Sequence, residues 1–108
     1  MNIPEEYSDM VGMIRLNTPF ARKIGFTSDK FLGYLWLDND RIMISSIISL
    51  HENKGNLSRL FKSIWKMGFK VAVPTPSAKM RIILIIKGFE RKDEWFEEAG
   101  AMCEVWEK

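Results

Sequence analysis

The feature that most constrains the fold is a helical repeat enclosed by two strand-like segments. Apolar side chains recur with the spacing i, i+3, i+4, i+7 and i+8 at Leu57, Leu60, Phe61, Ile64 and Trp65. This spacing places them along one stripe of an α-helix, and Gly68 is typical of the point where a helix ends. An apolar segment, residues 41–50, precedes the helix, and a short one, residues 70–73, follows it. The order predicts a β-α-β unit with a right-handed crossover between parallel strands.

A hairpin is expected just before this unit. Residues 31–37 and 41–50 are rich in β-branched and aromatic side chains, and Asp38-Asn39-Asp40 between them is a good turn sequence. Ser45 and Ser46 interrupt the alternation of the second arm, which indicates either a β-bulge or a polar cluster facing a cleft.

Two helices are predicted ahead of the hairpin. Residues 5–16 carry apolar side chains at roughly helical spacing. Thr18 and Pro19 are typical of a helix N-cap and first position, so a second, short helix is expected over residues 19–24, ended by Gly25.

The rest of the chain is expected to form a helix and two strands. Thr75 and Pro76 predict the start of a helix over residues 78–87, and its apolar run predicts that the helix is buried. Strands are expected near residues 89–96 and 101–106. The prediction is one domain, residues 1–108, of the α/β class, with a mixed β-sheet, flanking helices and the order αα-ββ-α-β-α-ββ.

Charge is distributed unevenly along the chain. Residues 53–89 contain no Asp or Glu but eight cations, at Lys54, Arg59, Lys62, Lys66, Lys70, Lys79, Arg81 and Lys87. A basic segment favours an anionic partner such as a nucleotide-like cofactor, a nucleic acid or an acidic protein. The alternative is a solvated helix face whose charge is balanced by the acidic C-terminal strands.

Composition excludes several classes of protein. With one histidine, His51, and one cysteine, Cys103, a structural zinc site is nearly excluded, and we expect no metal. The lone cysteine precludes an internal disulfide and fits a reducing compartment. No apolar run is long enough to span a bilayer, and the N-terminus lacks the pattern of a secretion signal. We expect a cytoplasmic protein with no membrane partner.

Residues 31–108 resemble the GNAT-type N-acetyltransferase fold. The expected hairpin is followed by a glycine loop at Gly55, a helix, a short strand, a helix ending in Lys87-Gly88-Phe89 and two strands. The resemblance implies acetyl-CoA as the cofactor and an amine on a protein or small molecule as the acyl acceptor. In that family, backbone N–H groups of the glycine loop and the following helix bind the pyrophosphate of the cofactor.

The resemblance implies a set of cofactor-binding residues. Backbone groups at Ile47 and Ile48 would contact the thioester oxygen, and Ser77 stands where the family often has an asparagine. The loop and the first helical turn would supply the rest, at Lys54, Gly55, Asn56, Leu57, Ser58 and Arg59.

The sequence departs from the family pattern at three positions. Glu52 stands where the family has Arg or Gln, and Leu57 replaces its second small residue. Leu84 occupies the position of the tyrosine that many members use as the acid. Amine acylation needs a base and an acid. The candidates left are His51 and Glu52 as the base and Tyr34 as a further catalytic residue.

These departures support other functions as well. One alternative is a non-catalytic GNAT-like module that binds a protein partner or forms a homodimer through its aromatic surface. Another is a nucleic-acid-binding protein that uses the basic helix, residues 59–70, although the chain contains no recognised nucleic-acid motif.

Overall fold

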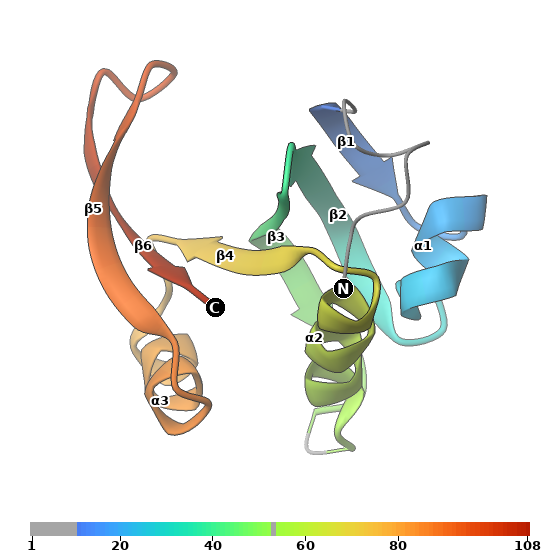
Figure 1. The fold of residues 1–108 in the computed structure, drawn as a ribbon. Coiled ribbons are helices and arrows are strands. Elements are labelled where there is room, and N and C mark those ends of the chain that lie inside the picture. The colour runs from blue at the N-terminus through green and yellow to red at the C-terminus, as the bar shows by residue number, and fades with distance from the viewer. Residues whose placement is uncertain (1–10, 53) are drawn as a thin grey trace.

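The described part of the chain forms a six-stranded sheet with three helices packed around it (Figure 1). The computed structural model describes residues 11–52 and 54–108. Its elements are β1 (Val11–Arg15), α1 (Pro19–Ile24), β2 (Phe31–Asp38), β3 (Arg41–Ser49), α2 (Asn56–Lys66), β4 (Lys70–Pro74), α3 (Ala78–Ile86), β5 (Glu90–Phe96) and β6 (Ala101–Glu107).

The sheet is mixed, with the strand order β1-β2-β3-β4-β6-β5. Strands β1, β2 and β3 pair antiparallel, β3 and β4 pair parallel across α2, and β6 pairs antiparallel with both β4 and β5. The predicted α/β class, the hairpin and the parallel β-α-β unit are therefore confirmed.

The prediction of a helix over residues 5–16 is wrong for the part of this segment that the structure describes. Residues Val11–Arg15 form strand β1, paired along its length with β2, and residues 5–10 lie outside the described part of the chain. Ile14 is buried while its neighbours Met13 and Arg15 are exposed, which is the alternation of a strand. A free edge of β2 offers this segment a ladder of hydrogen bonds that local spacing cannot reveal.

The helix ends follow local sequence signals, with one correction. Thr18 caps α1 and Gly25 ends it in the left-handed conformation, as predicted. Helix α3 is capped by Ser77, whose Oγ accepts a hydrogen bond from the Met80 amide at 3.2 Å, and not by Thr75. Thr75 has a φ of 41° and lies in the turn that leaves β4.

Helix α3 is largely exposed, contrary to the prediction of a buried helix. Leu84 is its one buried residue and belongs to the core, whereas Ile82, Ile85 and Ile86 are 60–79% exposed. The helix lies beside the start of the β5–β6 hairpin, away from α1 (Figure 1).

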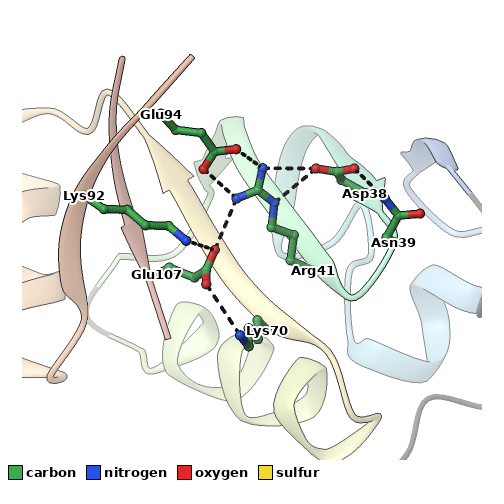
Figure 2. A network of polar contacts seen from close by, with 7 residues as sticks. All are labelled: Asp38, Asn39, Arg41, Lys70, Lys92, Glu94 and Glu107. Atoms are coloured by element: carbon green, nitrogen blue, oxygen red, sulfur yellow. Dashed lines mark hydrogen bonds and ion pairs between the residues drawn. The ribbon is translucent and has the colours of Figure 1, made fainter. Parts of the chain in front are cut away.

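An ion-pair network joins the β5–β6 hairpin to β3. Arg41, at the start of β3, donates from Nη1 to Glu94 of β5 at 2.9 Å and to Glu107 of β6 at 3.2 Å (Figure 2). Its Nε also donates to Asp38 at 3.1 Å. These bonds raise the pKa of Arg41 and lower that of Glu94. Lys92 adds a contact of 3.1 Å to Glu107. The network links both strands of the hairpin to the start of β3.

Strands β3 and β4 part from each other soon after they pair. The last aligned pair is Met43 with Ala72, although β3 continues to Ser49. Beyond this pair, Val73 and Pro74 align with β6, and no further β3–β4 pair occurs in residues 11–52 and 54–108. The register of β2 against β3 also shifts here, with one extra residue in β3 beside Ser45, which agrees with the bulge alternative.

Candidate functional site

A cavity of about 470 Å³ opens beside the part of β3 that has no partner in β4. Its walls come from the end of β3, the loop that follows, the first turn of α2 and the length of α3. The lining residues are Ile47, Ile48, Ser49, His51, Glu52, Gly55, Asn56, Leu57, Ser58, Ser77, Lys79, Met80, Ile83, Ile86 and Lys87.

Nine of the predicted site residues lie together in this lining. They are Ile47, Ile48, His51, Glu52, Gly55, Asn56, Leu57, Ser58 and Ser77. Lys54, Arg59 and Tyr34 are not part of it. Tyr34 lies in the middle of β2, aligned with Arg15 and Ser46, and its side chain is 37% exposed on the open face of the sheet.

The glycine loop is held in shape by Arg59. Gly55 has a φ of 77°, which favours glycine, and a Cβ at this position would lie 3.1 Å from Nη1 of Arg59. The Arg59 guanidinium donates to the Lys54 carbonyl at 2.7 Å and to Oδ1 of Asn56 at 2.6 Å. Asn56 is 8% exposed, so this bond satisfies a buried amide oxygen. Arg59 therefore positions the loop instead of lining the cavity.

The first turn of α2 presents backbone N–H groups at the edge of the cavity. Its N-cap is Gly55, which offers no side-chain cap, and the first turn holds no acidic residue. The opening amides of a helix have no partner within it and carry a partial positive charge. This end of α2 is thus electropositive.

A lysine from α3 adds a full positive charge beside that turn. Lys87, at the C-terminal end of α3, donates from Nζ to Oγ of Ser58 at 2.6 Å. The bond joins the two walls of the cavity at the α2 N-terminus. The ammonium group is partly buried and faces the electropositive turn.

A second lysine neutralises the single carboxylate of the lining. Nζ of Lys79, in the first turn of α3, lies 2.9 Å from Oε2 of Glu52, in the loop after β3. Both side chains are exposed, at 72% and 61%. The pair bridges the loop and α3 at the solvent side of the cavity. His51 precedes Glu52 in the same loop and is exposed.

The residue at the family's tyrosine position is outside the cavity. Leu84 is fully buried in the core and does not line the cavity. Among the described residues, neither this position nor Tyr34 supplies an acid at the cavity wall. The imidazole of His51 and the carboxylate of Glu52 are the groups of the lining that can accept a proton, with the two lysines as cations.

Sequence reasoning missed the contribution of α3. Met80, Ile83, Ile86, Lys79 and Lys87 line the cavity, but the prediction of a buried helix assigned this face to the core. The sequence did contain a signal for this contribution. Lys79 and Lys87 belong to the basic segment and lie near the two ends of the predicted helix.

The remaining basic residues are partly balanced by acids. Lys70 lies 3.8 Å from Glu107, and Arg81 lies 2.7 Å from Glu104. The contacts agree with the charge-balanced alternative for this segment. Nucleic-acid binding through residues 59–70 stays a prediction.

Two further properties of the described residues bear on the site. In residues 11–52 and 54–108, no three His, Cys, Asp or Glu side chains gather closely enough to hold a metal ion. No helix in this part of the chain is long and apolar enough to cross a membrane.

Fold and cavity together define an α/β protein with a ligand-sized opening beside the end of β3, beyond its last pair with β4. No family model matches the chain, and comparisons with curated proteins and with solved structures give no match either.

Proposed function

We propose that the cavity binds the acyl-pantetheine end of an acyl-CoA and that the protein transfers the acyl group to an amine. The observation that carries the proposal is the divergence of β3 and β4 beyond Met43 and Ala72, with the cavity beside it. Backbone groups on that side of β3 are left without a β4 partner. The pantetheine arm contains amide groups, and these can hydrogen-bond to such an unpaired strand edge as the amides of an added strand would.

The size and polarity of the cavity fit this ligand. A volume of about 470 Å³ is within the usual range for small-molecule sites, roughly 300–1,000 Å³. Its walls are apolar at Ile47, Ile48, Met80 and Ile83, which suits a pantetheine chain. Phosphate groups would meet the first turn of α2 and the Lys87 ammonium.

The chain's own residues can supply part of the chemistry. When bound, the cofactor supplies an acyl thioester. His51 is the base of this proposal, since it lines the cavity and a neutral imidazole accepts a proton from an attacking amine. Glu52 is engaged by Lys79 and is the weaker candidate. Backbone N–H groups near Ile47 would stabilise the oxyanion.

A non-catalytic version of the same site is a second candidate. The buried Leu84 and the absence of Tyr34 from the lining favour it, because among the described residues neither position then supplies an acid for the leaving thiolate. Exposed apolar side chains on the open face of β1 and β2, at Met13, Leu32 and Trp36, would then serve a protein partner or a second copy.

Release of free CoA thiol from acetyl-CoA in the presence of an amine panel tests the proposal and separates the two candidates. The enzyme proposal predicts amine-dependent thiol release that falls at least about tenfold in His51→Ala. Asn39→Ala, in the β2–β3 turn, is the control and should retain it. Binding of CoA without any thiol release supports the non-catalytic candidate, whereas absence of binding refutes both.

A further inference from the structure

One face of the sheet carries exposed apolar side chains from three neighbouring strands. In β2, Leu35 points into the core with residues of α1 and α2, and the alternate side chains point to the opposite face. The strand register places Met13 of β1 beside Trp36 on that face, and it places Ile48 of β3 beside Leu32. The open face of the sheet is thus defined by Met13, Leu32, Tyr34, Trp36 and Ile48, which are 37–62% exposed.

The apolar area of the open face matches what one copy contributes to a homodimer. With about 200 Å² for a large side chain, these five side chains expose on the order of 500 Å². A standard interface takes about 800 Å² from each partner, and roughly 65% of a homodimer interface is apolar. Such an interface therefore needs about 500 Å² of apolar surface from each copy.

The charges along the open face favour one orientation of two such faces. Arg15 of β1 is exposed and aligned with Tyr34 at one end of the face. At the other end, the β2–β3 turn carries two acids, Asp38 and Asp40, against one cation, Arg41. Because Arg41 is shared with two glutamates of the β5–β6 hairpin, this end is acidic on balance. Stacking with antiparallel strands brings each basic end to the acidic end of the other copy.

The register of β1 against β2 locates the symmetry axis of such a pair. Trp36 lies midway along β2 between the level of Arg15 and that of Asp38, and Met13 lies at the level of Trp36. A twofold axis along the row of Met13 and Trp36 reverses the strands, so residues above the row meet residues below it. Trp36 then lies opposite Trp36 of the second copy, at the centre of the interface, where aromatic hot spots are usually found.

The exposed apolar surface of α3 is less suited to a second copy. Its members are Ile82, Ile85 and Ile86. The helix and Lys87 directly after it carry three cations and no acid, so two stacked copies of this surface bring like charges together. On the open face, in contrast, the charges of the two copies are complementary.

We propose that the protein forms a homodimer in which the open faces of two copies pack against each other with antiparallel strands. The two sheets form a sandwich with about 10 Å between them, and α1 and α2 of each copy cover its outer sides. The inference goes beyond the proposed function and does not depend on it, because the central residues Met13 and Trp36 do not line the cavity. Ile48, at the edge of the interface, is the one residue of the open face that does.

Sedimentation velocity of the full chain at increasing concentration tests the homodimer. The wild type should be a dimer above about 10 µM. Trp36→Glu should raise the dimer dissociation constant at least about 30-fold, and Met13→Lys should weaken the dimer as well. Ile85→Glu places the same charge on the exposed surface of α3 and should leave the dimer unchanged.

A charge reversal tests the proposed contact between the basic and the acidic end. Arg15→Glu should raise the dimer dissociation constant roughly 5- to 20-fold, because acids then face acids. Lys62→Glu makes the same charge change at an exposed position of α2 and is the matched control.

Disulfide formation tests the orientation of the two copies. A side chain on the twofold axis meets its own copy, so Met13→Cys in a Cys103→Ser background should give a disulfide-linked dimer on mild oxidation. Leu32→Cys, at the end of the open face, should not. Cross-linking through Leu32→Cys alone would overturn the antiparallel arrangement.

The remaining outcomes also decide the proposal. A wild type that stays monomeric up to about 500 µM overturns it, as does a dimer that survives both Trp36→Glu and Met13→Lys. A dimer lost in Ile85→Glu but kept in Trp36→Glu assigns the second copy to α3 and overturns it too. Circular dichroism and thermal unfolding show that each variant is folded before its association is compared. Titration with CoA is a separate measurement, and its failure refutes the proposed function alone.

Discussion

Met43 of β3 and Ala72 of β4 are the last aligned residues of the parallel pair at the centre of the sheet. Beyond them β3 runs on to Ser49 beside a cavity, while β4 turns to β6. A parallel ladder that stops halfway leaves strand edge available for a ligand. The site therefore depends on the point where β3 and β4 stop pairing. The glycine loop and α2 follow the unpaired end of β3 directly in the chain.

The conformation of the glycine loop should matter for both stability and binding. Gly55→Ala places a Cβ at positive φ and 3.1 Å from Arg59 Nη1, so the free energy of unfolding should fall by about 1–2 kcal/mol. CoA affinity should fall as well, because the loop amides move. Gly100→Ala is the matched control: it also has positive φ but no atom within 4 Å of the added Cβ, and it lies in the β5–β6 turn. If the control loses as much CoA affinity as Gly55→Ala, the loop has no special role in binding.

Lys87 should contribute to ligand affinity through its charge. Lys87→Met removes the ammonium next to Ser58, and we expect the dissociation constant for both CoA and 3′-dephospho-CoA to rise roughly 5- to 20-fold. The loss should be similar for the two ligands, because the inner phosphates are common to both. Titration calorimetry measures it, with Lys87→Arg as the charge-retaining variant. An unchanged affinity for both ligands in Lys87→Met contradicts the placement of the inner phosphates.

The two faces of α3 should respond differently to truncation. Leu84→Ala removes a fully buried side chain, and its cost should be about 2–5 kcal/mol of the free energy of unfolding. Ile85→Ala, at a 60% exposed neighbour, should change it by no more than about 0.5 kcal/mol. Urea denaturation of the two variants compares them on the same helix. Similar costs for both would mean that Ile85 is covered in solution, as in a dimer.

Acid should destabilise the protein partly through Glu104. The hydrogen bonds from Arg81 and Trp106 lower the pKa of this carboxyl from its ordinary 4.5 to about 2. Between these values the unfolded chain binds a proton that the native chain does not, so stability falls as the pH drops from about 4.5 to about 2.

The variant Arg81→Met isolates this effect from other carboxylates. It removes the larger of the two causes, so its stability should depend less steeply on pH in this window than that of the wild type. Chemical denaturation at several pH values measures the slope. Parallel slopes in the two proteins would show that Glu104 is not held ionised by Arg81.

The Arg41 network should stabilise the attachment of the β5–β6 hairpin (Figure 2). Arg41→Met leaves Glu94 and Glu107 without their shared partner, so we expect a loss of about 1–3 kcal/mol in the free energy of unfolding. Lys92→Met, at a half-exposed member of the network, should cost no more than about 1 kcal/mol. Hydrogen exchange should show faster opening of the hairpin in Arg41→Met than in Lys92→Met. Equal protection of the hairpin in both would contradict its anchoring by Arg41.

Much of the fold could be predicted because its signals are local. The Asp38-Asn39-Asp40 turn, the Thr18 cap and the apolar stripe of α2 each act within a few residues, and the structure contains all three. The glycine loop was placed correctly for the same reason. The order of strand, helix and strand then predicted the parallel pairing of β3 with β4.

The misassigned parts depend on distant residues. The segment around Ile14 is a strand because β2 offers it an edge, and its local spacing also suits a helix. The isoleucines of α3 look like core in sequence but face solvent or the cavity. Arg41 and Glu94 are 53 residues apart in the sequence, and the tertiary structure brings their side chains together.

The same distinction applies to the site. The residues along one stretch, from Ile47 to Ser58, could be assembled from the order of elements. Lys79 and Lys87 could not, because their position depends on how α3 packs across the cavity. Tyr34 was a candidate by elimination, and the structure places it in the middle of β2, outside the lining of the cavity.

Amide chemical-shift mapping during titration with CoA tests the central claim most directly, because it reports both binding and location. The account predicts saturable shifts concentrated in the end of β3, the loop around Gly55, the first turn of α2 and along α3, with the tip of the β5–β6 hairpin unaffected. Absence of shifts at millimolar CoA, or shifts confined to the hairpin, would contradict it.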